Sequence, residues 1–148
     1  MLTVKTFLFS ALVFLSSALY AVEPIQTSFL SSTAVSGYDT VAYFTEGVAI
    51  KGTKEFAHEW MDAKWLFSSE ENLELFKAKP EFFMPQFGGY CAYAVGLGKT
   101  ARGNPTQFTV VDGKLYLNYN SKTKVLWEDD QEELISAAEK HWPELLAK

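Results

Sequence analysis

The chain carries one cysteine, and its setting is the most reactive that the sequence offers. Cys91 lies just after the pair Gly88-Gly89 and near the start of segment 90–97, whose small residues predict a short helix. A thiol in the first turn of a helix faces unpaired backbone N–H groups and the positive end of the helix dipole, which favours the thiolate as nucleophile or metal ligand. Cys91 is therefore the candidate centre.

The other soft-metal donors that the chain offers are His58, His141 and Met84. Asp39 could act as an acid or base, and Tyr90 could orient a ligand by its hydroxyl. Copper(I) and zinc(II) bind thiolate, imidazole and thioether donors, so these two metals are the cofactors to consider. No two of the residues have the Cys-x-x-Cys or His-x-x-x-His spacing of a metal motif. Each also has a structural interpretation: a core histidine, a methionine filling the core, a turn carboxylate and a packed tyrosine.

Three functions for Cys91 stay open. The first is a non-enzymatic domain that binds a transition metal or small ligand at Cys91. The second is a thiol-dependent enzyme or redox sensor. The third is a structural or partner-binding domain whose cysteine is buried and inert. The sequence has no Gly-x-Ser-x-Gly elbow, phosphate loop or haem attachment motif, which favours a protein without enzymatic activity.

The first 21 residues have the pattern of a secretory signal peptide. Lys5 precedes an apolar run of about ten residues, and small residues follow up to Ala21. Cleavage after Ala18 or Ala21 would release a periplasmic or secreted protein without a membrane span, whereas a retained anchor is the alternative. In an oxidising compartment the lone cysteine cannot form an internal disulfide.

Length and charge bound the remaining possibilities. A chain of 148 residues with 48% hydrophobic residues is expected to form one domain, which we place at 37–148. The net charge of -5 and the absence of a basic stripe argue against nucleic acid as a partner. A protein partner is left open.

Three segments predict antiparallel hairpins, and the residues before them predict a flexible leader or irregular strap over 22–36. The clearest hairpin is 108–117, because Asp112-Gly113 separates two alternating strands. Segments 38–51 and 56–67 have β-branched and aromatic residues on both sides of a turn.

Short helices are expected between and after these hairpins. A capping box at Ser68 and Glu71 predicts a helix that ends before Pro80. Two more helices are predicted from Asn120 or Ser121 to 127 and over 129–141, the latter ended by Pro143. His141 near that helix end is favoured there as an imidazolium. Together these elements predict a small α+β domain with antiparallel hairpins packed against short helices.

Four segments in order resemble the exported YHS-domain proteins of bacteria, and the resemblance covers about 35–143. The segments are 37–44, 65–72, 85–92 and 112–120. The resemblance implies a small α+β domain associated with metals, with Asp39, Tyr90 and Cys91 as the site residues to carry over. The chain departs from the family at Thr40, where proline is usual, and has no histidine beside Cys91.

Overall fold

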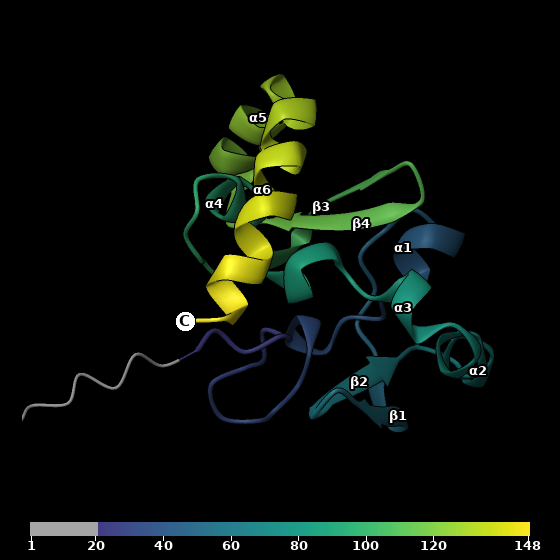
Figure 1. The fold of residues 1–148 in the computed structure, drawn as a ribbon. Helices are drawn as coiled ribbons and strands as arrows, with labels where there is room; N and C mark the ends of the chain where they lie inside the picture. The colour runs from purple at the N-terminus through teal and green to yellow at the C-terminus, as the bar shows by residue number, and fades with distance from the viewer. Residues whose placement is uncertain (1–20) are drawn as a thin grey trace, which may run out of the picture.

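Two antiparallel hairpins and six α-helices make up the part of the chain that the computed structural model describes, residues 21–148 (Figure 1). The predicted signal peptide lies outside these residues except for Ala21. The strands are β1 (Thr53–Trp60), β2 (Ala63–Phe67), β3 (Asn104–Val111) and β4 (Lys114–Asn118). The α-helices are α1 (Ala42–Thr45), α2 (Glu70–Ala78), α3 (Pro80–Phe83), α4 (Ala92–Gly96), α5 (Ser121–Asp129) and α6 (Gln131–Leu146). The 3₁₀ turns are η1 (Val35–Gly37) and η2 (Gln86–Gly89). The predicted α+β class is confirmed.

The hairpins at 56–67 and 108–117 are confirmed as β1–β2 and β3–β4. In the second hairpin Asp112 and Gly113 both have positive φ, 51° and 72°, which is the backbone that a two-residue turn between twisted strands needs. The first hairpin turns in the same way at Met61 and Asp62, with φ of 50° and 56°. In each hairpin the pairing register shifts at the end far from the turn, between Thr53 and Ala57 in β1 and between Asn104 and Phe108 in β3, which indicates a bulge.

The hairpin predicted at 38–51 is wrong. Its first half forms helix α1, and Tyr38 and Lys51 pair only as an isolated bridge. The cause is the Asp39 carboxylate, whose Oδ1 accepts hydrogen bonds from the N–H groups of Val41 (2.9 Å) and Ala42 (3.2 Å). These bonds satisfy donors that a helix leaves free at its start, so the chain turns instead of extending.

The start of α2 and the end of α6 also differ from the predicted helix boundaries. The N-cap of α2 is Ser69, one residue after the predicted cap, and its hydroxyl accepts from the Asn72 N–H at 3.1 Å. Helix α6 runs through Pro143 to Leu146. Leu145 beyond the proline is buried in the core, so packing outweighs the backbone bond that proline removes.

The segment 22–36 is an irregular strap across the domain. Ile25, Ala34 and Val35 are buried, and Thr27 pairs with Ala34 across a protruding loop. Its path requires glycine at position 88, because a Cβ there would collide with the backbone carbonyl of Pro24. The strap therefore belongs to the folded unit.

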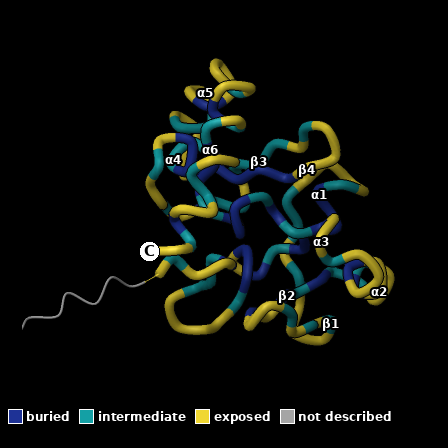
Figure 2. The backbone as a smooth tube through the Cα atoms, in the orientation of Figure 1, coloured by how far each residue is buried: buried dark blue, intermediate teal, exposed yellow. Residues whose placement is uncertain are grey.

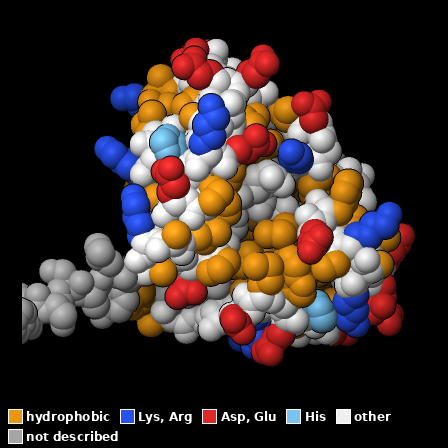
Figure 3. Space-filling view, in the orientation of Figure 1, with side chains coloured by type: hydrophobic (Ala, Val, Ile, Leu, Met, Phe, Trp, Pro, Cys, Tyr) orange, Lys and Arg blue, Asp and Glu red, His pale blue; other side chains and the backbone are white. Residues whose placement is uncertain are grey.

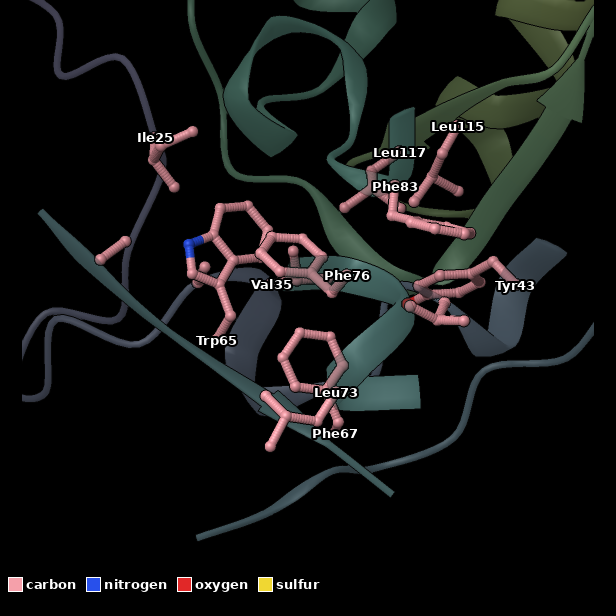
Figure 4. Close-up of a cluster of buried hydrophobic side chains, with 13 residues drawn as sticks. Ile25, Val35, Tyr43, Trp65, Phe67, Leu73, Phe76, Phe83, Leu115 and Leu117 are labelled. Carbon is pink, nitrogen blue, oxygen red and sulfur yellow. The ribbon is translucent and has the colours of Figure 1, made fainter. Parts of the chain in front are cut away.

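Strand β4 separates two hydrophobic clusters. Leu115 and Leu117 face the first cluster with Tyr43 and Phe83, as Figure 4 shows. Tyr116, between them in sequence, faces the second cluster, which α5 and α6 cover. Alternation of side chains along a strand explains this division. Both faces of β4 are covered, and Figure 2 shows it as a buried stretch.

Phe76 lies at the centre of the first cluster. Its ring centroid is 5.0 Å from that of Trp65 and 4.9 Å from that of Phe67, and the side chain has no exposure to solvent. Phe76→Ala should lower the free energy of unfolding by about 3–5 kcal/mol, because it leaves a cavity among aromatic rings. Urea unfolding measures the loss, with Phe82→Ala at a half-exposed position as the control. Equal effects of the two substitutions would contradict the assignment.

Candidate functional site

Cys91 occupies the N-cap position of α4 and is only 1% exposed. Its backbone forms a parallel bridge with Leu117 of β4. Its N–H donates to the carbonyl of Ala101 at 2.9 Å, so the loop after α4 covers it. The cysteine thus lies between the end of β4 and that loop, away from solvent.

The thiol makes hydrogen bonds in both directions within the chain. Sγ–H donates to Oδ1 of Asn118 at 3.5 Å, and the N–H of Tyr119 donates to Sγ at 3.2 Å. The sequence predicted that the thiol would face the free N–H groups of its helix. The N–H of Tyr93 donates instead to Asn118 Oδ1 at 3.1 Å, so Asn118 caps α4 in place of Cys91.

Sequence reasoning did not identify Asn118 as part of this site. The only signal was a polar residue at the end of a strand whose preceding residues, 115–117, are all apolar. Asn118 is completely buried, and within residues 21–148 its Nδ2 has no hydrogen-bond partner. A buried donor without a partner costs about 1–3 kcal/mol, so Asn118 is retained at a cost in stability.

The strap positions the loop that covers Cys91. The N–H of Gln26 donates to the carbonyl of Gly88 at 2.9 Å, and its side-chain Oε1 accepts from the N–H of Gly103 at 2.7 Å. Gln26 therefore joins the turn before Cys91 to the loop after it. The sequence contained no local signal for this role, because the two contacts lie more than 60 residues from Gln26 in the chain.

The other predicted site residues have separate structural surroundings. His58 lies on the core-facing side of β1, with its ring centroid 6.3 Å from that of Phe76. Met84 packs against the first cluster. The Tyr90 ring lies 5.8 Å from that of Trp142, and burial, followed by the nearby Glu23, raises the pKa of its hydroxyl. None of these contacts is with the Cys91 thiol.

Asp39 is completely buried and acts as a hydrogen-bond acceptor for three segments. Oδ1 accepts from the start of α1, as described above. Oδ2 accepts from the N–H of Ser68 at 2.9 Å, the hydroxyl of Ser68 at 2.6 Å and Nδ2 of Asn72 at 2.8 Å. All five bonds are internal, so this carboxylate serves as a hydrogen-bond acceptor that joins the three segments.

The residues around Cys91 do not fit a copper or zinc ion in this arrangement. Nowhere in residues 21–148 do three or more histidine, cysteine, aspartate or glutamate side chains gather closely enough to hold a metal. The side chain that contacts the thiol is Asn118, whose Oδ1 accepts from the thiol and from Tyr93 and whose Nδ2 is an N–H donor that repels a cation. The arrangement suits a buried thiol that fills space and hydrogen-bonds within the core.

Comparison of the chain with protein-family models, curated proteins and solved structures found no match. Within the described residues, no helix combines the length and the apolar character needed to cross a membrane. The site is therefore interpreted from its own geometry.

Substitution of Asp39 tests its structural role. Asp39→Asn replaces one acceptor oxygen by an NH₂ group facing other donors, so we expect the free energy of unfolding to fall by roughly 3 kcal/mol. Chemical denaturation measures the change, and Asp62→Asn in the exposed turn is the matched control. A loss no larger than that of the control would show that the five bonds contribute little.

The buried Tyr43 should make stability depend on alkaline pH. Its hydroxyl donates to the carbonyl of Pro105 at 2.7 Å, and burial raises its pKa far above the ordinary value, with smaller contributions from Tyr38 and Asp39. The folded state then holds a proton that the unfolded chain releases above about pH 10. Stability is therefore complete below pH 10 and falls as the pH rises further.

Unfolding in urea at a series of pH values from 8 to 11.5, roughly the range around the tyrosine pKa, measures this dependence. Tyr43→Phe removes the titrating group and should reduce the slope above pH 10. A residual slope is expected, because burial also raises the pKa values of Tyr90 and Tyr116. An unchanged slope in Tyr43→Phe would contradict the assignment.

Proposed function

We propose that the protein is an exported, non-enzymatic binding domain in which Cys91 is a structural residue. The observation that carries this proposal is the complete use of the thiol inside the core, where it both donates and accepts a hydrogen bond and is 1% exposed. Reactive cysteines lie in partially exposed, electropositive surroundings, whereas buried structural ones are inert.

Two further features support a binding role over catalysis. The Asp39 carboxylate, a second buried group that could do acid–base chemistry, accepts five internal hydrogen bonds. The surface carries acidic side chains where α5 meets α6, among them Asp129, Asp130 and Glu132 (Figure 3). Such a surface disfavours nucleic acid, so the proposed partner is a protein. Export rests on the leader pattern and on the resemblance to exported YHS-domain proteins.

A second candidate is a small-ligand site beside Cys91, favoured by the free Nδ2 of Asn118. This amide would donate to an acceptor atom of the ligand, so the ligand class is a small neutral or anionic molecule rather than a metal ion. Entry would require local opening of the loop that covers Cys91 at Ala101.

Thiol accessibility tests the structural role. In the native protein, alkylation of Cys91 by N-ethylmaleimide should be slower than that of free cysteine by a factor of about 1,000 or more, because reaction requires opening of the fold. The rate should rise with urea as unfolding does. Mass spectrometry measures both the rate and any metal that copurifies with the protein.

Cys91→Ser and Cys91→Ala are the matched variants. Both should keep the secondary structure, with Cys91→Ala less stable by about 1–3 kcal/mol because Asn118 Oδ1 and the Tyr119 N–H each lose a partner. Rapid native alkylation would contradict the proposal and favour thiol chemistry. Stoichiometric copper or zinc that is lost in Cys91→Ser would contradict it in favour of a metal site.

A further inference from the structure

The tip of the strap loop exposes two adjacent large apolar side chains. Phe29 is 94% exposed and Leu30 is 90% exposed, whereas the next most exposed large apolar residue among residues 21–148, Val125, is 55% exposed. No charged residue occurs between Pro24 and Ser36. An isolated exposed leucine needs no explanation, but a protruding apolar pair with uncharged flanks is a candidate contact for a partner.

Backbone hydrogen bonds hold this tip in one shape. The N–H of Ser28 donates to the carbonyl of Thr33 at 3.0 Å, and the N–H of Ser31 donates to the carbonyl of Ser28 at 3.2 Å. The base of the loop is bonded to β2, where the N–H of Lys64 donates to the carbonyl of Ser32 at 2.8 Å. The apolar pair therefore points in a set direction, which lowers the entropy cost of binding.

A cavity of about 800 Å³ lies beside the same loop. One wall is residues 31–33 of the loop, and the other lining residues come from the two strands and the turn of the β1–β2 hairpin. The hairpin contributes apolar surface from Ala57 and Leu66, which are opposite each other in the register. Ligand pockets have volumes in this range, so the cavity has room for two side chains.

The charged residues that line the cavity are balanced in sign. Lys54 and Lys64 contribute two positive charges, and Glu59 and Asp62 contribute two negative charges. A surface with both signs can pair with a rotated copy of itself without a net repulsion. Because the strap tip carries no charge, its entry into the cavity would cost no desolvation of charged groups on the tip.

We propose that this face binds a second copy of the chain, with Phe29 and Leu30 of each copy inserted into the cavity of the other. The protruding pair and the cavity lie next to each other on one molecule, which is the arrangement that a two-fold symmetric interface requires. This inference rests on the proposed function as a binding domain and names its partner. The Cys91 site takes no part in the interface.

Sedimentation equilibrium of the processed protein tests the proposal. The wild-type chain should form a concentration-dependent dimer, and the double variant F29S/L30S should raise the dissociation constant about 100-fold or more, since each dimer loses four buried apolar side chains. The control Val125→Ser, on α5, should leave the constant unchanged. A wild-type protein that stays monomeric up to about 1 mM would overturn the proposal.

A second measurement identifies the two surfaces without relying on loss of binding. A mixture of Leu30→Cys and Ala57→Cys chains should be joined by a short bismaleimide into a mixed dimer, and a mixture of Val125→Cys and Ala57→Cys should not. Cys91 is buried and is not expected to compete. Equal cross-linking in both mixtures, or a dimer unaffected by F29S/L30S, would overturn the proposal.

Binding to phosphatidylcholine vesicles tests the alternative that the strap tip contacts a lipid surface. Wild-type binding that is lost in F29S/L30S, from a protein that stays monomeric, would assign the loop to a lipid surface and overturn the dimer. The results of these dimer experiments can be told apart from the results of the Cys91 experiments. A monomer with a protected thiol would overturn only this inference, and a dimer with a reactive or metal-bearing thiol would overturn only the proposed function.

Discussion

The Asp39 carboxylate is the interaction on which the arrangement of the first half of the domain depends. It lies at the start of α1 and accepts hydrogen bonds from Ser68 at the end of β2 and from Asn72 in α2. A buried carboxylate would be costly without partners, and the bonds offset that cost while bringing three segments to one point. The aromatic cluster around Phe76 then packs beneath elements whose positions this carboxylate sets.

Strand β4 has the corresponding role in the second half. Its two faces line different clusters, and its end supplies Asn118, which caps α4 and contacts the Cys91 thiol. The cysteine is thus part of the junction between sheet and helix. This position explains why a residue type known for reactivity is enclosed by hydrogen bonds of the chain itself. The strap adds Gln26 as a clamp across the same region.

The apolar tip of the strap and the cavity beside it contrast with the hydrogen-bonded surroundings of Asp39 and Cys91. Inside the domain, the Cys91 thiol and the Asp39 carboxylate find partners within the chain, whereas Phe29 and Leu30 at the surface find none in the described residues. A binding surface must keep such groups free in the monomer, and the cost in exposed apolar area is met only when a partner covers them. The proposed interface and the hydrogen-bonded surroundings of Cys91 are therefore separate parts of the molecule.

Local patterns in the sequence determined the α+β class, the hairpin at Asp112-Gly113 and the helix after Asn120, because turn backbone and helix capping depend on neighbouring residues. They also identified Cys91 as the candidate centre and interpreted Asp39 as a turn carboxylate. Tertiary structure decided what those residues do. Asp39 favours a helix over the predicted hairpin, and Cys91 is hydrogen-bonded to Asn118, 27 residues away in the sequence. Such contacts depend on which segments fold against each other, and spacing along the chain does not contain that information.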